Sequence, residues 1–422
     1  MSRSGHRRIT DLAADPAVHR AFHWLHLHEL QLRRWQTEFL AIPAPPFQED
    51  ARAVWFCRRF RQLGLQEPHI DREGNAVGLL RGGSPQAATG AVLLSAHLDT
   101  VFPAGTPCRP QDDGPRILCP GACDNGAGLT ALLAIIAALK YAGLDPPCPL
   151  VFAANVGEEG EGDLRGMRHL FNEPPFGLSP SAAIALEGAG NALVVDRALG
   201  SRRLRITISG PGGHSWADAH RPNPILVLSA ALLALARLPL PREPRTTLNI
   251  GTVQGGTSVN SVPETAMAQV DLRSTSALEL DRLEYAILQT VSAEVAAATV
   301  SRAEAEGLRL HAERIGDRPL GALPPDAPLY KSLLAVDRHL GIHTEPRIGS
   351  TDANLPLARG VPALAIGTGG TGAGLHSTAE WYDPTGRELA LRRVLLLLLD
   401  TCSLVAQQQQ RTEPDRTFER VG

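Results

Sequence analysis

The sequence is poor in cysteine and has no long apolar run. Six cysteines are spread over 422 residues and none forms a C-x-x-C pair, which argues against a disulfide framework and favours reduced thiols in a reducing compartment, the cytoplasm. Cys119 and Cys123 lack the second Cys/His pair of a zinc-finger site. The longest apolar segments, residues 129–139 and 225–235, are shorter than the ~18 residues of a membrane span, so we expect two buried helices and no membrane anchor.

A strong charge bias is also missing, and we expect no secretory leader. The chain has 41 basic and 44 acidic residues, a net charge of −3, without a long block of one sign, which is not the footprint of nucleic-acid binding. Residues 1–8 are basic, but the apolar core of a secretory signal does not follow them. With 43% hydrophobic and 20% charged residues, the composition is that of a soluble globular protein, and its length predicts two domains.

The chain does contain four short apolar stretches that each lead into histidine or carboxylate side chains. They are residues 91–97, 149–157, 182–186 and 361–366. Their length and their Gly and Pro boundaries are typical of buried parallel strands. From residue 75 to 190 such strands alternate with helical segments, which predicts an α/β domain with a mixed, mainly parallel sheet flanked by helices. In such sheets ligands bind outside the carboxyl ends of the strands.

The pattern changes after residue 198. Strand-like and helical segments then follow in the order β-α-β-β-α-β, over residues 204–210, 223–238, 247–253, 265–273, 277–300 and 308–314. This order is that of a ferredoxin-like α+β unit. We therefore expect a catalytic domain formed by residues 1–198 and 317–422, with an inserted domain at residues 199–316.

The side chains at the strand ends suggest one metal site assembled from distant segments. A hydrolytic metal needs about three protein ligands and an open position for water, and two metals that share a carboxylate need about five. The strand ends supply His97, one of the pair Glu158-Glu159, Glu187 and His376. The fifth candidate, Asp124, precedes the helix predicted at residues 129–139, whose dipole favours a carboxylate there.

Two further features fit supporting roles. Asp99 lies two residues after His97 and on the same face of an extended strand, where its carboxylate could accept the second ring N–H of His97. Glu158 and Glu159 are neighbours in an extended segment and should diverge. One of them could then bind metal while the other faces the substrate and acts as a general base.

Six motifs in one order carry a resemblance to a known family. They are S-A-H-L-D-T-V-F-P (95–103), G-A-C-D-N-G-A-G (121–128), G-E-E-G (157–160), L-E-G (186–188), P-G-G-H-S (211–215) and H-S-T-A-E (376–380). Over residues 40–400 the sequence resembles the di-zinc aminoacylase/carboxypeptidase family of metallopeptidases, which includes glutamate carboxypeptidases, acetylornithine deacetylases and peptidase T. The resemblance implies a hydrolase with two zinc ions per chain, for which cobalt or manganese could substitute.

The resemblance also implies roles for the candidates in the first domain. It makes Asp124 the bridge between the metals, assigns His97 and Glu187 to one metal, and assigns Glu159 and His376 to the other. It makes Glu158 the general base and Asp99 the residue that orients His97. It further implies a cis peptide bond between Asp124 and Asn125.

The inserted domain resembles the lid and dimerisation domain of the family, which implies a homodimer. There, His214 would stabilise the oxyanion of the tetrahedral intermediate, often by reaching across the dimer. Asn260 and Arg273 match positions that hold the amide and the free carboxylate of the substrate, and the guanidinium fork of arginine suits a carboxylate.

The substrate implied by the resemblance is an N-acyl amino acid or a short peptide with a free carboxylate. Asp124-Asn125-Gly126 stands where many members have Asp-x-Lys and is closer to peptidase T, whereas Glu187 stands where aminopeptidases usually carry Asp and deacylases or carboxypeptidases carry Glu. An aminopeptidase or tripeptidase of the same family therefore remains an alternative. A non-catalytic binding protein that keeps the fold is a second one, against which the intact ligand set argues.

Other motifs favour different functions only weakly. Residues 367–372 match G-x-G-x-x-G after a strand, but neither a following apolar helix nor an opening βαβ unit supports dinucleotide binding. The G-x-S-x-G elbow of serine hydrolases does not occur in the sequence. Asp352 and Asn354 either line the site or form a turn.

Overall fold

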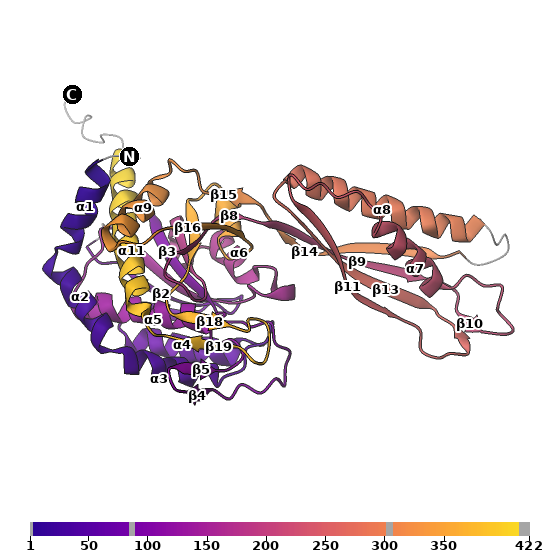
Figure 1. The fold of residues 1–422 in the computed structure, drawn as a ribbon, viewed down its shortest axis with the longest axis horizontal. Helices are drawn as coiled ribbons and strands as arrows, with labels where there is room; N and C mark the ends of the chain where they lie inside the picture. Colours follow the sequence, from indigo (N-terminus) through magenta and orange to yellow (C-terminus); the bar gives the residue numbers. More distant parts are fainter. Residues whose placement is uncertain (1–2, 84–88, 301–306, 413–422) are drawn as a thin grey trace, which may run out of the picture. The chain divides into compact units, whose positions relative to one another are not determined.

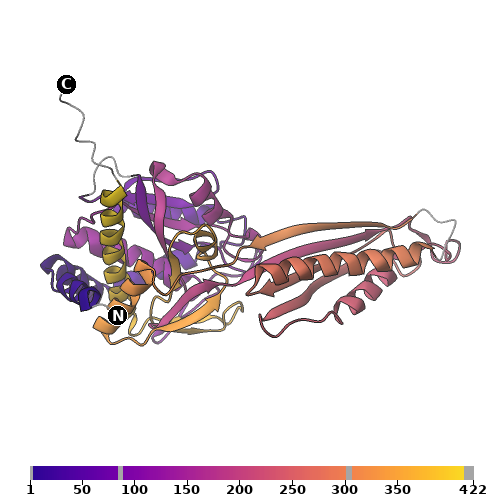
Figure 2. The same ribbon diagram turned by 90° about the horizontal axis from the view of Figure 1, so that it is seen from above.

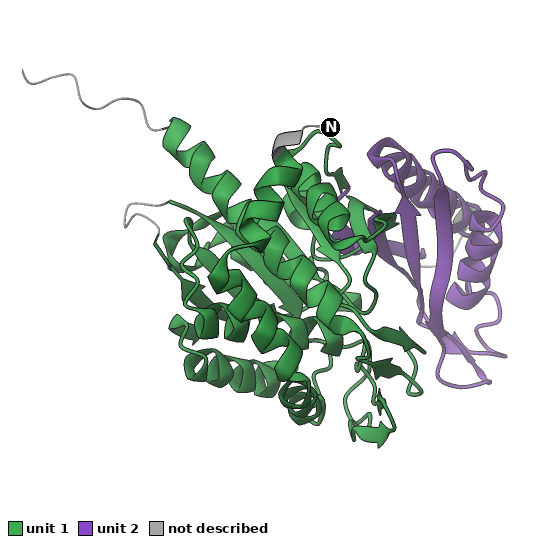
Figure 3. Cartoon of the chain, turned by 60° about the vertical axis from the view of Figure 1, so that its left-hand side comes forward, with its two compact units in different colours: residues 1–198, 321–422 green, residues 199–320 purple. Residues whose placement is uncertain are grey.

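The computed structural model describes residues 3–83, 89–300 and 307–412. The chain divides into two compact units, one formed by residues 1–198 and 321–422 and the other by residues 199–320 (Figure 3). None of the helices in the described part of the chain combines the length and the apolar character of a membrane span. The described cysteines are all unpaired, as their low number predicts.

A mixed sheet forms the centre of the first unit (Figure 1). In spatial order its strands are β1 (Gln66–Ile70), β2 (Ala76–Leu80), β6 (Leu150–Asn155), β3 (Gly90–His97), β7 (Ser179–Leu186), β17 (Ala363–Ile366), β8 (Leu193–Ala198) and β15 (Gly321–Ala322), and β16 (Glu345–Gly349) also pairs with β8. The four predicted strands lie at its centre, and β6, β3, β7 and β17 run parallel. The predicted α/β fold with parallel central strands is therefore confirmed.

The central strands are apolar on both faces because both faces are covered. Every residue of β2, β3, β6 and β17 is buried, as expected for strands between two layers. Helix α5 (Gly126–Ala142) contacts β3 and β7, and its residues are buried apart from Lys140 and Tyr141. The buried helix predicted at residues 129–139 is thus confirmed.

The other helices of this unit surround the sheet. They are α1 (Arg3–Ala13), α2 (Pro16–Leu27), α3 (Glu29–Leu40), α4 (Asp50–Gln62), α6 (Arg165–Asn172), α9 (Pro328–Leu340), α10 (Asn354–Ala358) and α11 (Arg387–Thr412). A second small sheet is made of β18 (Thr371–Ala373), β19 (Trp381–Asp383), β5 (Arg116–Leu118) and β4 (Gln111–Asp113). Sequence patterns do not reveal it, because three residues are too few to show an alternation.

The second unit has the predicted β-α-β-β-α-β order. Its elements are β9 (Gly200–Ser209), α7 (Pro224–Leu235), β11 (Thr246–Gly255), β13 (Thr265–Ser274), α8 (Ala277–Val300) and β14 (Arg309–Arg318). The strands lie in the order β11-β13-β9-β14, and α7 and α8 contact each other and the same face of the sheet (Figure 2). The unit also contains a short antiparallel ribbon of β10 (Gly213–His214) and β12 (Ser261–Val262). In the chain, β10 follows β9 and β12 precedes β13.

Helix α7 differs from the buried helix expected at residues 225–235. Leu226 is 68% exposed and Leu233 is 63% exposed, so the expectation of burial is wrong on this side of the helix. The reason is that α7 and α8 form a single layer, which leaves the outer side of α7 without a covering element within the unit. Val227, Leu228 and Ala231, on its inner side, are buried in the core.

Candidate metal centre

His97 and Glu187 meet because two parallel strands end at the same edge. His97 is the last residue of β3, and Glu187 directly follows β7, which pairs with β3 through Ser95 and Ala185. The Nε2 atom of His97 lies 3.4 Å from Oε1 of Glu187 and 3.2 Å from Oδ1 of Asp124. One potential ligand atom from each of these three residues lies within 4.8 Å of the others, which forms a first ligand group.

Asp124 also belongs to a second ligand group. Its Oδ2 atom lies 3.2 Å from Nε2 of His376, which is 3.4 Å from Oε1 of Glu159, and these three residues meet the same 4.8 Å limit. Asp124 therefore turns one oxygen toward His97 and the other toward His376. Glu158 and Glu159 also form a group with His97, so the two neighbouring glutamates do not diverge completely.

The donors of both groups suit a divalent cation. Asp124 Oδ1 and Glu187 Oε2 are buried and lack a hydrogen-bond partner of acceptable geometry, although a buried, unpaired carboxylate oxygen is costly. Imidazole nitrogens with carboxylate oxygens are the donor set of zinc and of cobalt or manganese sites. These residues would therefore fit two metal ions that share the carboxylate of Asp124.

Asp99 holds the acidic pair more than it holds His97. Its two carboxylate oxygens accept the backbone N–H groups of Glu158 at 3.0 Å and Glu159 at 2.7 Å. Nδ1 of His97 lies 3.0 Å from the backbone oxygen of Asp99 but 3.6 Å from the carboxylate. The expected contact is thus made mainly by the main chain, because β3 ends at His97 and the strand rule for alternate residues no longer applies.

The segment that carries Asp124 is bound to the end of β7. The peptide bond between Asp124 and Asn125 is cis, as the resemblance implies. The Asn125 amide donates to the carbonyl of Leu186 at 2.8 Å, and its Oδ1 accepts the N–H groups of Gly128 and Gly188. A Cβ atom on Gly128 would lie 2.5 Å from the Leu186 oxygen, so this close approach requires glycine.

Sequence reasoning missed the role of Glu380. Its buried carboxylate accepts three backbone N–H groups at 2.8 Å, those of Gly121, Cys123 and Asp124. Burial raises the pKa of Glu380 to about 7, although these hydrogen bonds act in the opposite direction. Glu380 is part of the H-S-T-A-E motif, but a single glutamate near a histidine gives no sign of contacts with a segment more than 250 residues away.

Asp352 and Asn354 lie in and directly after the turn that precedes α10. Both are buried. Asp352 accepts the side-chain N–H of Asn155, the last residue of β6, at 2.8 Å. Oδ1 of Asn354 accepts the N–H of Thr351 at 2.9 Å. These contacts support the turn between β16 and α10.

Without a cation, protonated histidines would balance the carboxylates. Burial lowers the pKa of His97, but Glu187, Asp124 and Asp99 outweigh it and hold the pKa well above 6.5. Hydrogen bonds to Asp124 and Glu159 raise the pKa of His376 to about 10. Burial raises the pKa of Glu187 to about 7 despite the attraction of His97. Metal binding at these residues would therefore release protons.

The three candidates in the second unit do not lie together. His214 in β10 pairs with Ser261 in β12, and the N–H of Ser215 donates to the carbonyl of Asn260 at 3.0 Å. This ribbon precedes the first residue of β13, whereas Arg273 is near the last and forms an ion pair with Asp271 at 2.7 Å. The roles of His214, Asn260 and Arg273 stay predictions.

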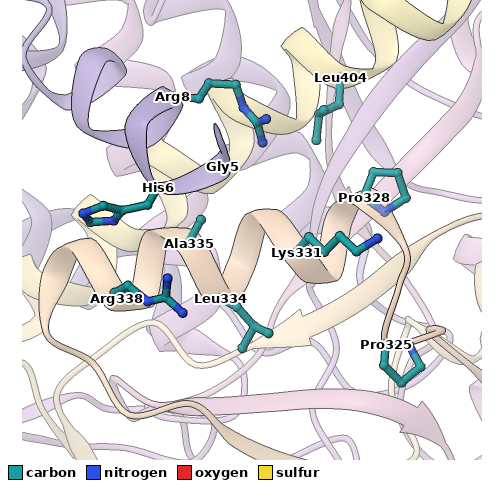
Figure 4. A pocket seen from close by; sticks show the side chains of 10 residues that line it. All are labelled: Gly5, His6, Arg8, Pro325, Pro328, Lys331, Leu334, Ala335, Arg338 and Leu404. Atoms are coloured by element: carbon teal, nitrogen blue, oxygen red, sulfur yellow. The ribbon is translucent and has the colours of Figure 1, made fainter. Parts of the chain in front are cut away.

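Two other features carry no candidate residue. A hollow of about 600 Å³ is lined mainly by residues of α1 and α9, among them His6, Arg8, Lys331 and Arg338 (Figure 4). The residues that line it do not include any member of the ligand groups. The G-x-G-x-x-G segment leads into β18 and not into a helix. A Cβ atom on Gly372 would lie 2.5 Å from Sγ of Cys123, so close packing accounts for this glycine.

Comparisons with known proteins agree with this architecture. The model of the family described as peptidase family M20/M25/M40 matches residues 93–400. A probable carboxypeptidase of Aspergillus clavatus is 35% identical over 203 residues, which cover 43% of this chain and 44% of that protein, so the match spans less than half of the relative's length.

Solved structures show a similar fold. A tripeptidase of Staphylococcus aureus has a TM-score of 0.68 at 21% identity, with 90% of this chain and 99% of that chain covered. The Bacillus subtilis YxeP protein, described as a dinuclear metal binding peptidase of the M20 family, has a TM-score of 0.62 at 15% identity, with 89% of this chain and 98% of that chain covered. At these identities the likeness is one of fold.

The buried carboxylate of Asp99 should make the stability of the fold depend on pH. Burial acts against it, but His97 and two backbone N–H groups lower the pKa of Asp99 below 3.8. Stability from this group is therefore present above pH 3.8 and lost as the pH falls through the lowered value. In Asp99→Asn the side-chain amide opposes one N–H, so we expect the free energy of unfolding to fall by ~1–3 kcal/mol at neutral pH.

Urea unfolding of the metal-free proteins between about pH 3 and 7 would measure this effect. The difference from the wild type should shrink toward the acid end, because the unfolded state then takes up a proton at Asp99 and the stability from this carboxylate is progressively lost. The exposed Asp113 provides a control, since Asp113→Asn should leave stability unchanged. A difference between wild type and Asp99→Asn that is the same at every pH would contradict the assignment.

Proposed function

The chain belongs to the peptidase family M20/M25/M40, and from this we propose that it is a dinuclear zinc hydrolase of amide bonds in N-acyl amino acids or short peptides with a free carboxylate. The observation that carries the proposal is the position of Asp124 between two histidine–carboxylate groups. A carboxylate shared in this way is the usual bridge between two hydrolytic metals. Cobalt and manganese accept the same donors.

The residues of this chain have separate tasks in the proposed reaction. Two bound divalent ions would polarise the substrate carbonyl and lower the pKa of the attacking water. His97 and Glu187 would hold one ion, Glu159 and His376 would hold the other, and Asp124 would contribute to both sites. The backbone carbonyl of Asp99, 3.0 Å from Nδ1 of His97, fixes which ring nitrogen faces the ions, as outer contacts of ligating histidines usually do.

Glu158 is the proposed general base. Its side chain is 5% exposed and lies near His97 and Glu159, and Asp99 fixes its backbone N–H. It would take the proton of the attacking water and return it to the leaving amine. A general base has to lie within hydrogen-bond reach of the proton that it takes, and a fixed backbone keeps Glu158 in place for this.

His214, Asn260 and Arg273 would bind the substrate from more than one chain. Arg273 lies eight positions after Thr265, the first residue of β13, which is ~26 Å of extended strand. The ribbon with His214 and Asn260 directly precedes Thr265, so it lies too far from Arg273 for all three to touch one small substrate in one chain. A homodimer would resolve this, with His214 and Asn260 reaching the site of the partner to meet the oxyanion and the amide.

Surface features of the second unit support the proposed dimer. Leu226 and Leu233 on α7 and Val253 on β11 are between 58% and 68% exposed. Strand β11 is at the edge of its sheet, where unpaired backbone groups can accept a further strand. A second copy of this chain would cover both features.

A cytoplasmic location remains the expectation from the low number of cysteines.

A substrate panel tests the function directly. Zinc- or cobalt-loaded protein should hydrolyse N-acyl amino acids or C-terminal peptide bonds, and the metal-free protein should be inactive until an ion is restored. Free-amine tripeptides in the same panel test the alternative, a tripeptidase, which the Asp124-Asn125-Gly126 segment favours. Fewer than about two ions per chain after reconstitution, by elemental analysis, would contradict the two-metal centre.

The variant Glu158→Gln tests the proposed base. Turnover should fall by at least ~10²-fold, because general-base catalysis contributes about that much, while both ions are retained. The exposed Glu161 in the same loop provides the control, since Glu161→Gln should keep its activity. Wild-type turnover by Glu158→Gln would remove this residue as the base.

Mixing two inactive chains tests the role of His214. A heterodimer of His214→Ala with Glu158→Gln contains one site with an intact base and an intact histidine from the partner. If His214 acts across the dimer, one of the two sites is complete, and the heterodimer should recover at most about half of the wild-type activity. A complete lack of activity in purified, differently tagged heterodimers would show that His214 acts within its own chain.

A further inference from the structure

One residue connects the loop of Asp124 with the loop of His376. The carboxylate of Glu380 accepts the N–H groups of Gly121, Cys123 and Asp124, each at 2.8 Å, and its backbone oxygen accepts the N–H of Cys119 at 3.1 Å. Glu380 is 1% exposed. A single buried residue therefore accepts four hydrogen bonds from the backbone of residues 119–124 and fixes this segment, which carries Asp124.

The same residue ends the turn that presents His376. His376 has a φ of 61° and a side chain that is 57% exposed, so it lies on an open turn, in contrast to His97 at a buried strand end. The turn is closed by hydrogen bonds from the N–H of Ser377 to the carbonyl of Gly374 and from the N–H of Glu380 to the carbonyl of Ser377. Glu380 thus attaches this turn to the segment of Asp124, next to the place where Trp381 of β19 pairs with Leu118 of β5.

A second contact supports the segment of Asp124 from the other side. The side-chain amide of Gln36 donates to the carbonyl of Ala122 at 2.9 Å, and Arg387 donates to Gln36 at 3.2 Å. This contact reaches only the segment of Asp124 and not the turn of His376. The pairing of β19 with β5 ends at Leu118, whereas the carboxylate of Glu380 reaches the N–H of Asp124 itself, so we expect the distance between Asp124 and His376 to depend on Glu380.

We propose that Glu380 is a positioning residue that sets the ligand group of Asp124, Glu159 and His376, an inference that rests on the proposed two-metal centre. The ligand group of His97 and Glu187 depends on it less, because both residues are held by β3 and β7. In Glu380→Gln one carboxylate oxygen becomes an N–H₂ donor, which opposes a backbone N–H at 2.8 Å. The turn and the segment would then shift apart.

Zinc titrations of metal-free full-length protein against a chromophoric chelator test this. The wild type should show two binding steps, and Glu380→Gln should weaken one of them by ~10–100-fold, the usual effect of losing an outer contact of a metal ligand. Asp337 provides the control: it is a buried carboxylate of the same unit that accepts hydrogen bonds from Arg393 and Thr344. Asp337→Asn should lower the melting temperature and leave both binding steps unchanged.

A double variant identifies the affected ion. His376→Ala removes a ligand of the second group, so adding Glu380→Gln to it should not weaken the remaining step further. If Glu380→Gln binds both ions like the wild type, or weakens both steps equally, the positioning role is overturned while the two-metal centre stands. A wild type that binds fewer than two ions would instead refute the proposed function.

Discussion

The parallel register of β6, β3, β7 and β17 is the constraint on which the candidate centre depends. His97 pairs with Asn155, Ser95 with Ala185 and Leu186 with Ile366, so the strands end at nearly the same level. A shift of one residue would turn each side chain to the other face of its strand and disrupt its close packing against the layer on that face. Residues from segments far apart in the sequence therefore reach one edge without long loops.

This convergence has a cost in stability. Asp99, Glu158 and Glu159 are buried. Asp99 accepts the N–H groups of both glutamates and Glu159 shares a ligand group with Asp124, so like charges lie close enough to repel. The raised pKa values of His97 and His376 indicate that protonated imidazoles offset the repulsion when cations are absent. Sites arranged for function rather than stability commonly carry such tension.

Local patterns in the sequence were sufficient for the residues at strand ends and helix starts. His97, Glu187 and Asp124 could be predicted because each follows an apolar strand or precedes an apolar helix, and the inserted unit because its alternation differs. The contacts of Glu380 with Gly121 and Asp124 join segments more than 250 residues apart, and no local pattern encodes them. The exposed side of α7 was missed for a similar reason, since apolar composition does not tell which neighbours are present.

The inserted unit leaves and re-enters the first unit at one β-bridge. Ala198, at the end of β8, pairs with Gly321 in β15, so the two points between which residues 199–320 are inserted are adjacent. For the first unit the insertion acts like the loop of a hairpin, because its two ends are joined by this bridge. The entropic cost of closing such a loop grows only slowly with the length of the inserted chain. Such an insertion can be lengthened or exchanged in evolution without breaking the strands that carry the candidate metal ligands. It can likewise unfold under force while these strands stay paired.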